Sequence, residues 1–191
     1  MDDSEKTRPP KRMLVTDSPA ELLGQAPRLA DLVKLRPLEG EAGLRFLNRL
    51  RASTTPEEAV TYAAFAALPN VAVGWGYECL RSMADHLSPL ERPMMQEVAT
   101  WLSSPSMSLR HKIMRDALYA PSRTPSVLLG LAVGWSTGGP APNDPEPAPA
   151  HKAPVALNAA VLSCLARVPL ARRPVHLARV LDMAETLFRV Y

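Results

Sequence analysis

The sequence contains few aromatic residues, glycines and cysteines, and each shortage narrows the possible folds. Aromatic residues make up 5% of the 191 residues, so a hydrophobic core must rest mainly on Leu, Ala, Val and Met. Nine glycines in an alanine-rich chain favour helices, because glycine is a poor helix former. The two cysteines, Cys79 and Cys164, are too few for the disulfide framework of a small secreted fold, and they show no CxxC spacing.

Strong charge and long apolar runs are also missing. The net charge is +3, and Lys and Arg are spread along the chain, whereas nucleic-acid binders usually concentrate them on one face. The longest apolar run, residues 127–135, is far shorter than the ~20 residues that cross a bilayer. The charged first twelve residues lack the apolar stretch of a secretory signal. We therefore expect a cytoplasmic protein with neither nucleic acid nor membrane as a partner.

Helix start signals dominate what is present. A capping residue followed by proline suits the first turn of a helix, and no sustained alternation indicates a strand. We therefore predict an all-α fold: a compact multi-helix bundle of seven to nine helices. The signal recurs at Ser18-Pro19, Thr55-Pro56, Ser88-Pro89, Ser104-Pro105 and Thr124-Pro125.

Proline and hydrophobicity suggest the domain organisation. Residues 1–17 are polar and broken by proline, which predicts a mobile N-terminal segment, and residues 18–191 then form a single helical domain. Residues 70–87 are apolar on two faces, which predicts the central helix. The proline-rich residues 138–154 predict an extended segment before the last two helices, either a strap packed across them or a free linker.

Motifs that carry chemistry are absent. The four histidines have no zinc-ligand spacing, and the chain has no glycine-rich phosphate loop and no GxSxG motif. We therefore predict no catalytic residue, no metal site and no cofactor. The one carboxylate considered as an acid or base is Glu78, and an ion pair with Arg81, three residues further on, is the more economical interpretation.

Tryptophan and methionine give the candidates for partner binding. Each tryptophan lies on the apolar face of a different predicted helix, where it either packs in the core or lines a groove for a partner. Methionines cluster in the middle of the chain, and flexible methionine surfaces adapt to varied partners. The candidate partner-binding residues are Trp75, Glu78, Arg81, Trp101, Trp135, Met94 and Met95.

Three segments together resemble an uncharacterised family of small, all-helical bacterial proteins. They are LPNVAVGWGYECLR at 68–81, LLGLAVGWSTGGPAPNDPEPAPAH at 128–151, and AVLSCLARV at 160–168. The matching features are a Leu-Pro pair, a tryptophan helix ending near a cysteine, and a Trp-Ser-x-Gly-Gly motif before the proline-rich segment. Gly74 departs from the pattern, because the family often has tryptophan there. The resemblance implies no activity, but such proteins often accompany type VI secretion loci.

These observations favour a non-enzymatic adaptor or chaperone that binds another protein, such as a secretion effector or a component of the apparatus. One alternative is an immunity protein that neutralises a toxin, and another is an enzyme that uses Glu78. The final amphipathic helix suits packing against its own core or against another copy, so the sequence leaves the oligomeric state open.

Overall fold

The structure is a computed structural model that describes residues 12–189, and these residues are almost entirely helical. They form ten α-helices and two 3-10 helices, with a single isolated β-bridge and no strand. The all-α class is confirmed, and the helices slightly exceed the expected number because both short N-terminal segments are helical. The elements are α1 (Pro19–Gln25), α2 (Pro27–Leu32), α3 (Gly43–Arg51), α4 (Glu57–Ala66), α5 (Pro69–Ser82), η1 (Ala84–His86), η2 (Pro89–Glu91), α6 (Arg92–Ser103), α7 (Met107–Leu118), α8 (Pro125–Trp135), α9 (Lys152–Arg167) and α10 (Arg173–Phe188).

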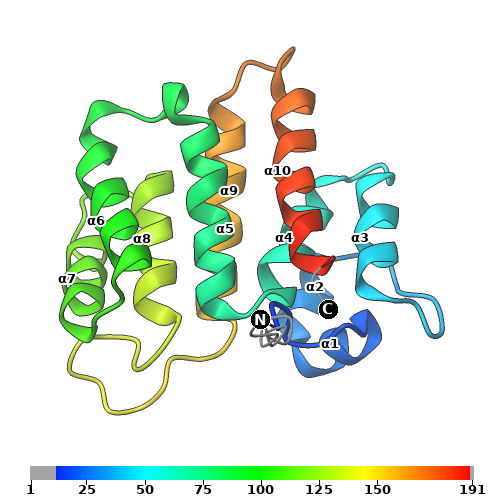
Figure 1. Ribbon diagram of the computed structural model, residues 1–191, viewed down its shortest axis with the longest axis horizontal. Coiled ribbons are helices and arrows are strands. Elements are labelled where there is room, and N and C mark those ends of the chain that lie inside the picture. Colours follow the sequence, from blue (N-terminus) through cyan, green and yellow to red (C-terminus); the bar gives the residue numbers. More distant parts are fainter. Residues whose placement is uncertain (1–11, 190–191) are drawn as a thin grey trace, which may run out of the picture.

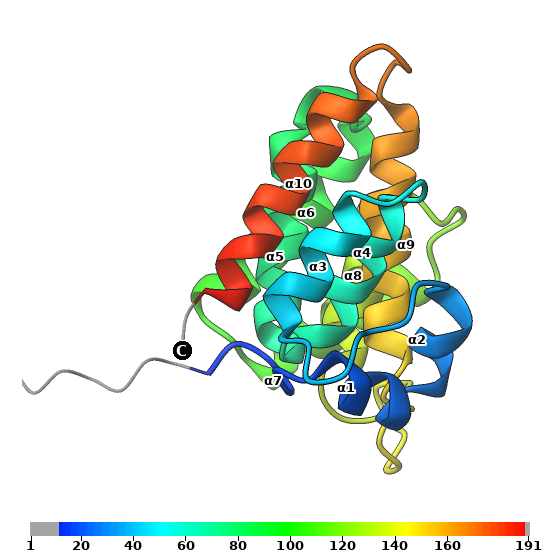
Figure 2. The ribbon, with the colours of Figure 1, turned by 90° about the vertical axis from the view of Figure 1, so that its right-hand side faces the viewer.

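The long helices form a bundle organised around α9. This helix packs against α8 on one side and against α4 and α5 on the other. Figure 1 shows α6, α7 and α8 grouped together on the left and α3, α4 and α10 on the right, while α1 and α2 lie at the lower end. In the turned view of Figure 2, α10 runs beside α3, α4 and α5, all of which it contacts.

The most enclosed helix is α8, whose residues are all buried except Leu128 and Trp135. Glycine makes this possible, because a Cβ added at Gly134 would lie 2.6 Å from the Cβ of Met114 on α7. The prediction that residues 70–87 form the central helix is wrong. Helix α5 buries one face only, leaves Arg81 exposed, and ends at Ser82.

Most of the predicted helix starts are confirmed. The hydroxyl oxygen of Ser18 accepts a hydrogen bond from the Glu21 amide, and Thr124 caps α8 in the same way. Ser88 and Glu91 form a capping box at η2. The predicted start at Ser104 is wrong by two residues, because Ser106 is the residue that caps α7.

The N-terminal boundary differs from the prediction where the structure describes it. The Val15 amide donates to the Ala66 carbonyl at 2.8 Å, and the Leu68 amide donates to the Met13 carbonyl at 2.8 Å. The side chain of Leu14 is buried between these bonds. Residues 13–15 are therefore fixed to the α4–α5 connection rather than belonging to a mobile segment, whereas residues 1–11 lie outside the described part.

The proline-rich segment forms a closed loop, not a strap across the bundle. The Ala148 amide donates to the Gly138 carbonyl at 2.8 Å, which brings the two ends of the loop together. The indole N–H of Trp135 holds the loop by donating to the Pro140 carbonyl at 3.0 Å. The loop is the yellow segment at the bottom of Figure 1, and α9 already begins at Lys152.

Candidate functional site

The predicted partner-binding tryptophans on α5 and α6 are core residues. Trp75 is 4% exposed, and its indole N–H donates to the Val180 carbonyl of α10 at 3.3 Å. Trp101 is 6% exposed. Both side chains are therefore core residues that expose little surface to a partner, and Trp101 also lines a pocket beside the start of α7.

The Glu78–Arg81 pair is a surface ion pair on α5. The Glu78 carboxylate accepts hydrogen bonds from Nε and Nη2 of Arg81 at 2.8 and 2.5 Å. The two side chains are 45% and 64% exposed, and the hydrogen bond to Glu78 raises the pKa of Arg81. Solvent screens such a pair strongly, so it orients two side chains with little effect on stability.

The other three candidates, Trp135 on α8 and the neighbouring Met94 and Met95 on α6, are half-buried. Trp135 contacts the proline-rich loop, and the Lys152 ammonium group lies 5.0 Å from the centre of its ring. Met94 and Met95 pack against the core, and the sulfur of Met94 would lie 2.8 Å from a Cβ added at Gly130. Because Trp75 and Trp101 are buried in the core, the seven predicted residues do not form one exposed surface, although Glu78 and Arg81 form an ion pair.

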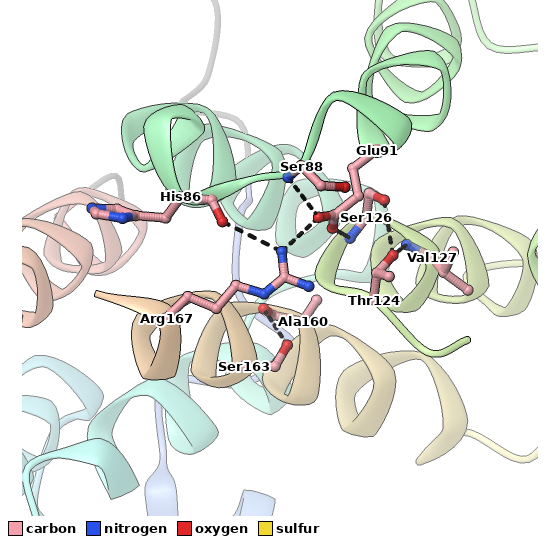
Figure 3. A network of polar contacts seen from close by, with 9 residues as sticks. All are labelled: His86, Ser88, Glu91, Thr124, Ser126, Val127, Ala160, Ser163 and Arg167. Atoms are coloured by element: carbon pink, nitrogen blue, oxygen red, sulfur yellow. Dashed lines mark hydrogen bonds and ion pairs between the residues drawn. The ribbon is translucent and has the colours of Figure 1, made fainter. Parts of the chain in front are cut away.

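An ion pair with a buried carboxylate, which the sequence did not reveal, joins η2 to the C-terminal end of α9. Glu91 is 2% exposed, and its carboxylate lies 2.5 Å from Nη1 of Arg167. The carboxylate also accepts from the amides of Ser88 at 2.9 Å and Ser126 at 3.3 Å, and Arg167 donates to the His86 carbonyl. Figure 3 shows these groups converging from η1, η2, α8 and α9. The network fixes the positions of four elements relative to one another.

The network also lowers the pKa of Glu91. Burial alone would raise that pKa, but the hydrogen bonds from Arg167, Ser88 and Ser126, together with the charge of Arg167, outweigh it. Both carboxylate oxygens thus accept hydrogen bonds from donors of the protein. The arrangement is typical of a structural ion pair and leaves no free carboxylate oxygen for chemistry.

A cavity lies at the other end of the bundle, where α1 and α2 meet the first turns of α5 and α9. Its volume is about 560 Å³, within the ~300–1,000 Å³ typical of ligand pockets. Small side chains such as Ala64, Ala67 and Ala72 make up much of its wall and leave the space open. The rest of the wall includes Val15, Leu22, Phe65, Val73, Ala132, Ala153, Pro154 and Leu157.

Polar side chains lie at the mouth of this cavity. Gln25, Arg28, Asp31 and His151 all line it and are all exposed. Arg28 and Asp31 lie 3.8 Å apart on α2, and both side chains remain hydrated. An apolar interior with a polar mouth can enclose an apolar group and orient it. The small side chains of Ala64 and Ala67 are the one sequence signal that could have indicated this space.

Two further properties concern the whole described chain. Between residues 12 and 189, no three His, Cys, Asp or Glu side chains are grouped so that they could hold a metal ion. In the same range no helix combines the length and the apolar character needed to cross a membrane. Both cysteines are buried thiols.

The described residues thus form an all-helical domain with an apolar cavity at one end. A family described as "Family of unknown function (DUF6931)" matches residues 46–188. The chain belongs to this family. Among curated proteins and among solved structures, no match was found.

Proposed function

We propose that this protein is a non-enzymatic binding module, an adaptor or chaperone, that receives an apolar segment of a partner protein in the cavity between α1, α2, α5 and α9. The single observation that carries this proposal is the cavity itself, about 560 Å³ in volume with a predominantly apolar wall. Pockets of this size and character are the default binding sites of proteins.

The position of the cavity suits a protein ligand. Its wall includes α1 and α2, two short helices, together with the N-terminal ends of the long helices α5 and α9. The mouth is rimmed by Gln25, Arg28, Asp31 and His151, which can form hydrogen bonds to the backbone of an entering segment. Apolar anchors in a pocket with a polar rim are the usual anatomy of a protein interface.

The partner we propose is a secretion effector or a component of a secretion apparatus. Support comes from the resemblance to proteins that accompany type VI secretion loci. An immunity protein would also bind a protein partner, and the identity of that partner distinguishes the two roles.

The test is an affinity purification from the native host with a matched pair of tryptophan variants. Ala150 is exposed and lines the cavity, whereas Ala141 is exposed in the same loop but does not line it. A protein recovered in stoichiometric amount with the wild type and with Ala141→Trp, but lost with Ala150→Trp, supports docking in the cavity. Equal recovery with both variants, or no partner with the wild type, would overturn the proposal. Circular dichroism checks that both variants are folded.

A further inference from the structure

A second pocket, of about 390 Å³, lies where the start of α5, the end of α6, the start of α7 and the turn after α8 meet. Its wall includes Pro69 and Asn70 from α5 and Ser136 and Thr137 from the turn after α8. These residues belong to two motifs that are distant in sequence, the Leu-Pro pair and the Trp-Ser-x-Gly-Gly motif. The fold therefore brings both motifs to one site.

A buried arginine of α7 lines this pocket and lacks a counterion. Arg110 is 2% exposed, and its Nη1 donates to the carbonyls of Gly134 and Thr137. Its Nη2 lies 2.7 Å from Nε2 of His111, and its Nε has no hydrogen-bond partner. No carboxylate of residues 12–189 forms an ion pair with it. Burial lowers the pKa of Arg110, yet a guanidinium group stays charged in proteins.

A second buried ion, Glu91, shows what Arg110 lacks. Glu91 has a full counterion in Arg167, 2.5 Å away, as well as two backbone amides. Arg110 has only the partial charges of carbonyl oxygens and one imidazole nitrogen. A buried charge without a counterion is costly, and a buried donor without an acceptor requires an explanation.

The backbone is shaped to admit this guanidinium group. Gly138 has a φ of 72°, a conformation that side chains other than glycine rarely adopt. A Cβ added there would lie 2.8 Å from Nη2 of Arg110. The glycine of the motif therefore allows the chain to pass close to the arginine.

The pocket also receives the positive ends of two long helices. Neither α5 nor α7 has an acidic residue in its first turn, and α5 has no capping side chain. The first backbone N–H groups of a helix have no partner within it, so those of Asn70 and Met107 are free to donate. Helix N-termini and arginine are the groups that proteins use most often to hold phosphate.

We propose that this pocket binds a phosphate group, which supplies the missing counterion of Arg110 and accepts hydrogen bonds from the first turns of α5 and α7. The group is either free inorganic phosphate or the phosphate of a small phosphomonoester. The pocket volume and the apolar surfaces of Trp101, Pro105 and Met107 leave room for an organic substituent. This inference is independent of the partner proposed for the larger cavity.

The test is a titration with inorganic phosphate and with phenyl phosphate at constant ionic strength, followed by amide NMR shifts and calorimetry. We expect saturable binding of at least one probe, with shifts concentrated at Asn70, Met107 and Thr137. Tighter binding of phenyl phosphate identifies a phosphomonoester as the ligand, and tighter binding of inorganic phosphate identifies the free anion.

The binding test uses substitutions at exposed asparagines and leaves the buried Arg110 in place, because removing that arginine could unfold the protein. Asn70→Asp places a carboxylate on the pocket wall and should weaken binding about tenfold through like-charge repulsion. Asn48→Asp makes the same change on α3, outside the pocket, and should bind as the wild type does. The proposal is overturned if neither probe binds saturably, or if Asn70→Asp binds as tightly as Asn48→Asp.

Discussion

Replacing Glu91 with glutamine removes the charge of the buried carboxylate while nearly preserving its shape. In the native protein Oε2 accepts from the Ser88 amide and from Arg167, and Oε1 accepts from the Ser126 amide. Glutamine offers one oxygen and one NH₂ group, so at least one of these donors must then face another donor. The substitution therefore both weakens the network and leaves a buried polar group without a partner.

The expected cost follows from the burial of the two partners. Breaking a buried ion pair costs about 3–5 kcal/mol, and a hydrogen bond to a charged group contributes about 1.5–3 kcal/mol. The Arg167 side chain is 36% exposed and can be hydrated when its partner is lost, which reduces the cost. We expect Glu91→Gln to lower the free energy of unfolding by about 2–4 kcal/mol, which corresponds to a melting temperature lower by roughly 6–12 °C.

The matched control is Glu78→Gln, the same change in the exposed pair on α5. The midpoints of thermal and urea unfolding of this variant should stay close to those of the wild type, because solvent screens that pair. Thermal and urea unfolding, followed by circular dichroism at 222 nm, measure both variants. Equal shifts for the two variants would refute the argument that burial makes the Glu91 network important.

The pH dependence gives an independent check on the same carboxylate. Because the folded state lowers the pKa of Glu91 from its ordinary value of 4.5, the network contributes stability above that value. The contribution is lost as the pH falls through the lower pKa of the folded state. The stability difference between wild type and Glu91→Gln should therefore shrink below about pH 4.5. A difference that stays constant down to pH 3 would contradict this assignment.

Three further predictions concern packing, thiols and histidine. Gly134→Ala should destabilise the protein by about 1–3 kcal/mol in urea unfolding, because Met114 of α7 leaves no room for the added methyl group. Gly74→Ala should instead stabilise the protein by about 0.5–1 kcal/mol, because alanine is the better helix former and its methyl group meets only ordinary contacts. Burial raises the pKa of Cys79 well above its ordinary value and that of Cys164 to about 11, so neither thiol should react with a disulfide reagent at pH 8 until the protein unfolds. Burial and nearby cationic groups lower the pKa of His176, so the unfolded state takes up a proton first as the pH falls below its ordinary value of 6.5. The stability of the wild type should then decrease between pH 7 and 5, and His176→Gln should show a shallower slope.

Local signals in the sequence were sufficient to predict where most helices begin, but not which other helices surround each of them. The caps at Ser18, Ser88 and Thr124 act on amides within the next three residues, so their chemistry can be read from neighbouring positions. The burial of α8 depends on helices that come from elsewhere in the chain. Residues 127–135 of α8 are the longest apolar run in the sequence, but the predicted central helix is the longer helix, and length alone does not show which of the two is surrounded on all sides.

The sites were harder to predict because their groups come from distant positions. The cavity wall combines Ala64, Ala72 and Leu157 from three helices, and none of these residues carries chemistry that would single it out. The tryptophans did stand out, and for that reason they were considered as contact residues. Trp75 and Trp101 are instead part of the core, because large aromatic side chains on an apolar helix face contribute most when they are buried.

Two of the buried ions, Glu91 and Arg110, lie at the two ends of the same helix, α8. Glu91, which is negative, accepts from the Ser126 amide at the start of α8, and Arg110, which is positive, donates to the Gly134 carbonyl near its end. These signs match the helix dipole, so each ion stabilises backbone groups that an enclosed helix cannot expose to water. At the start of α8 Arg167 balances the charge, but at its end no residue does. That difference between the two ends is the physical basis for the phosphate site proposed at Arg110.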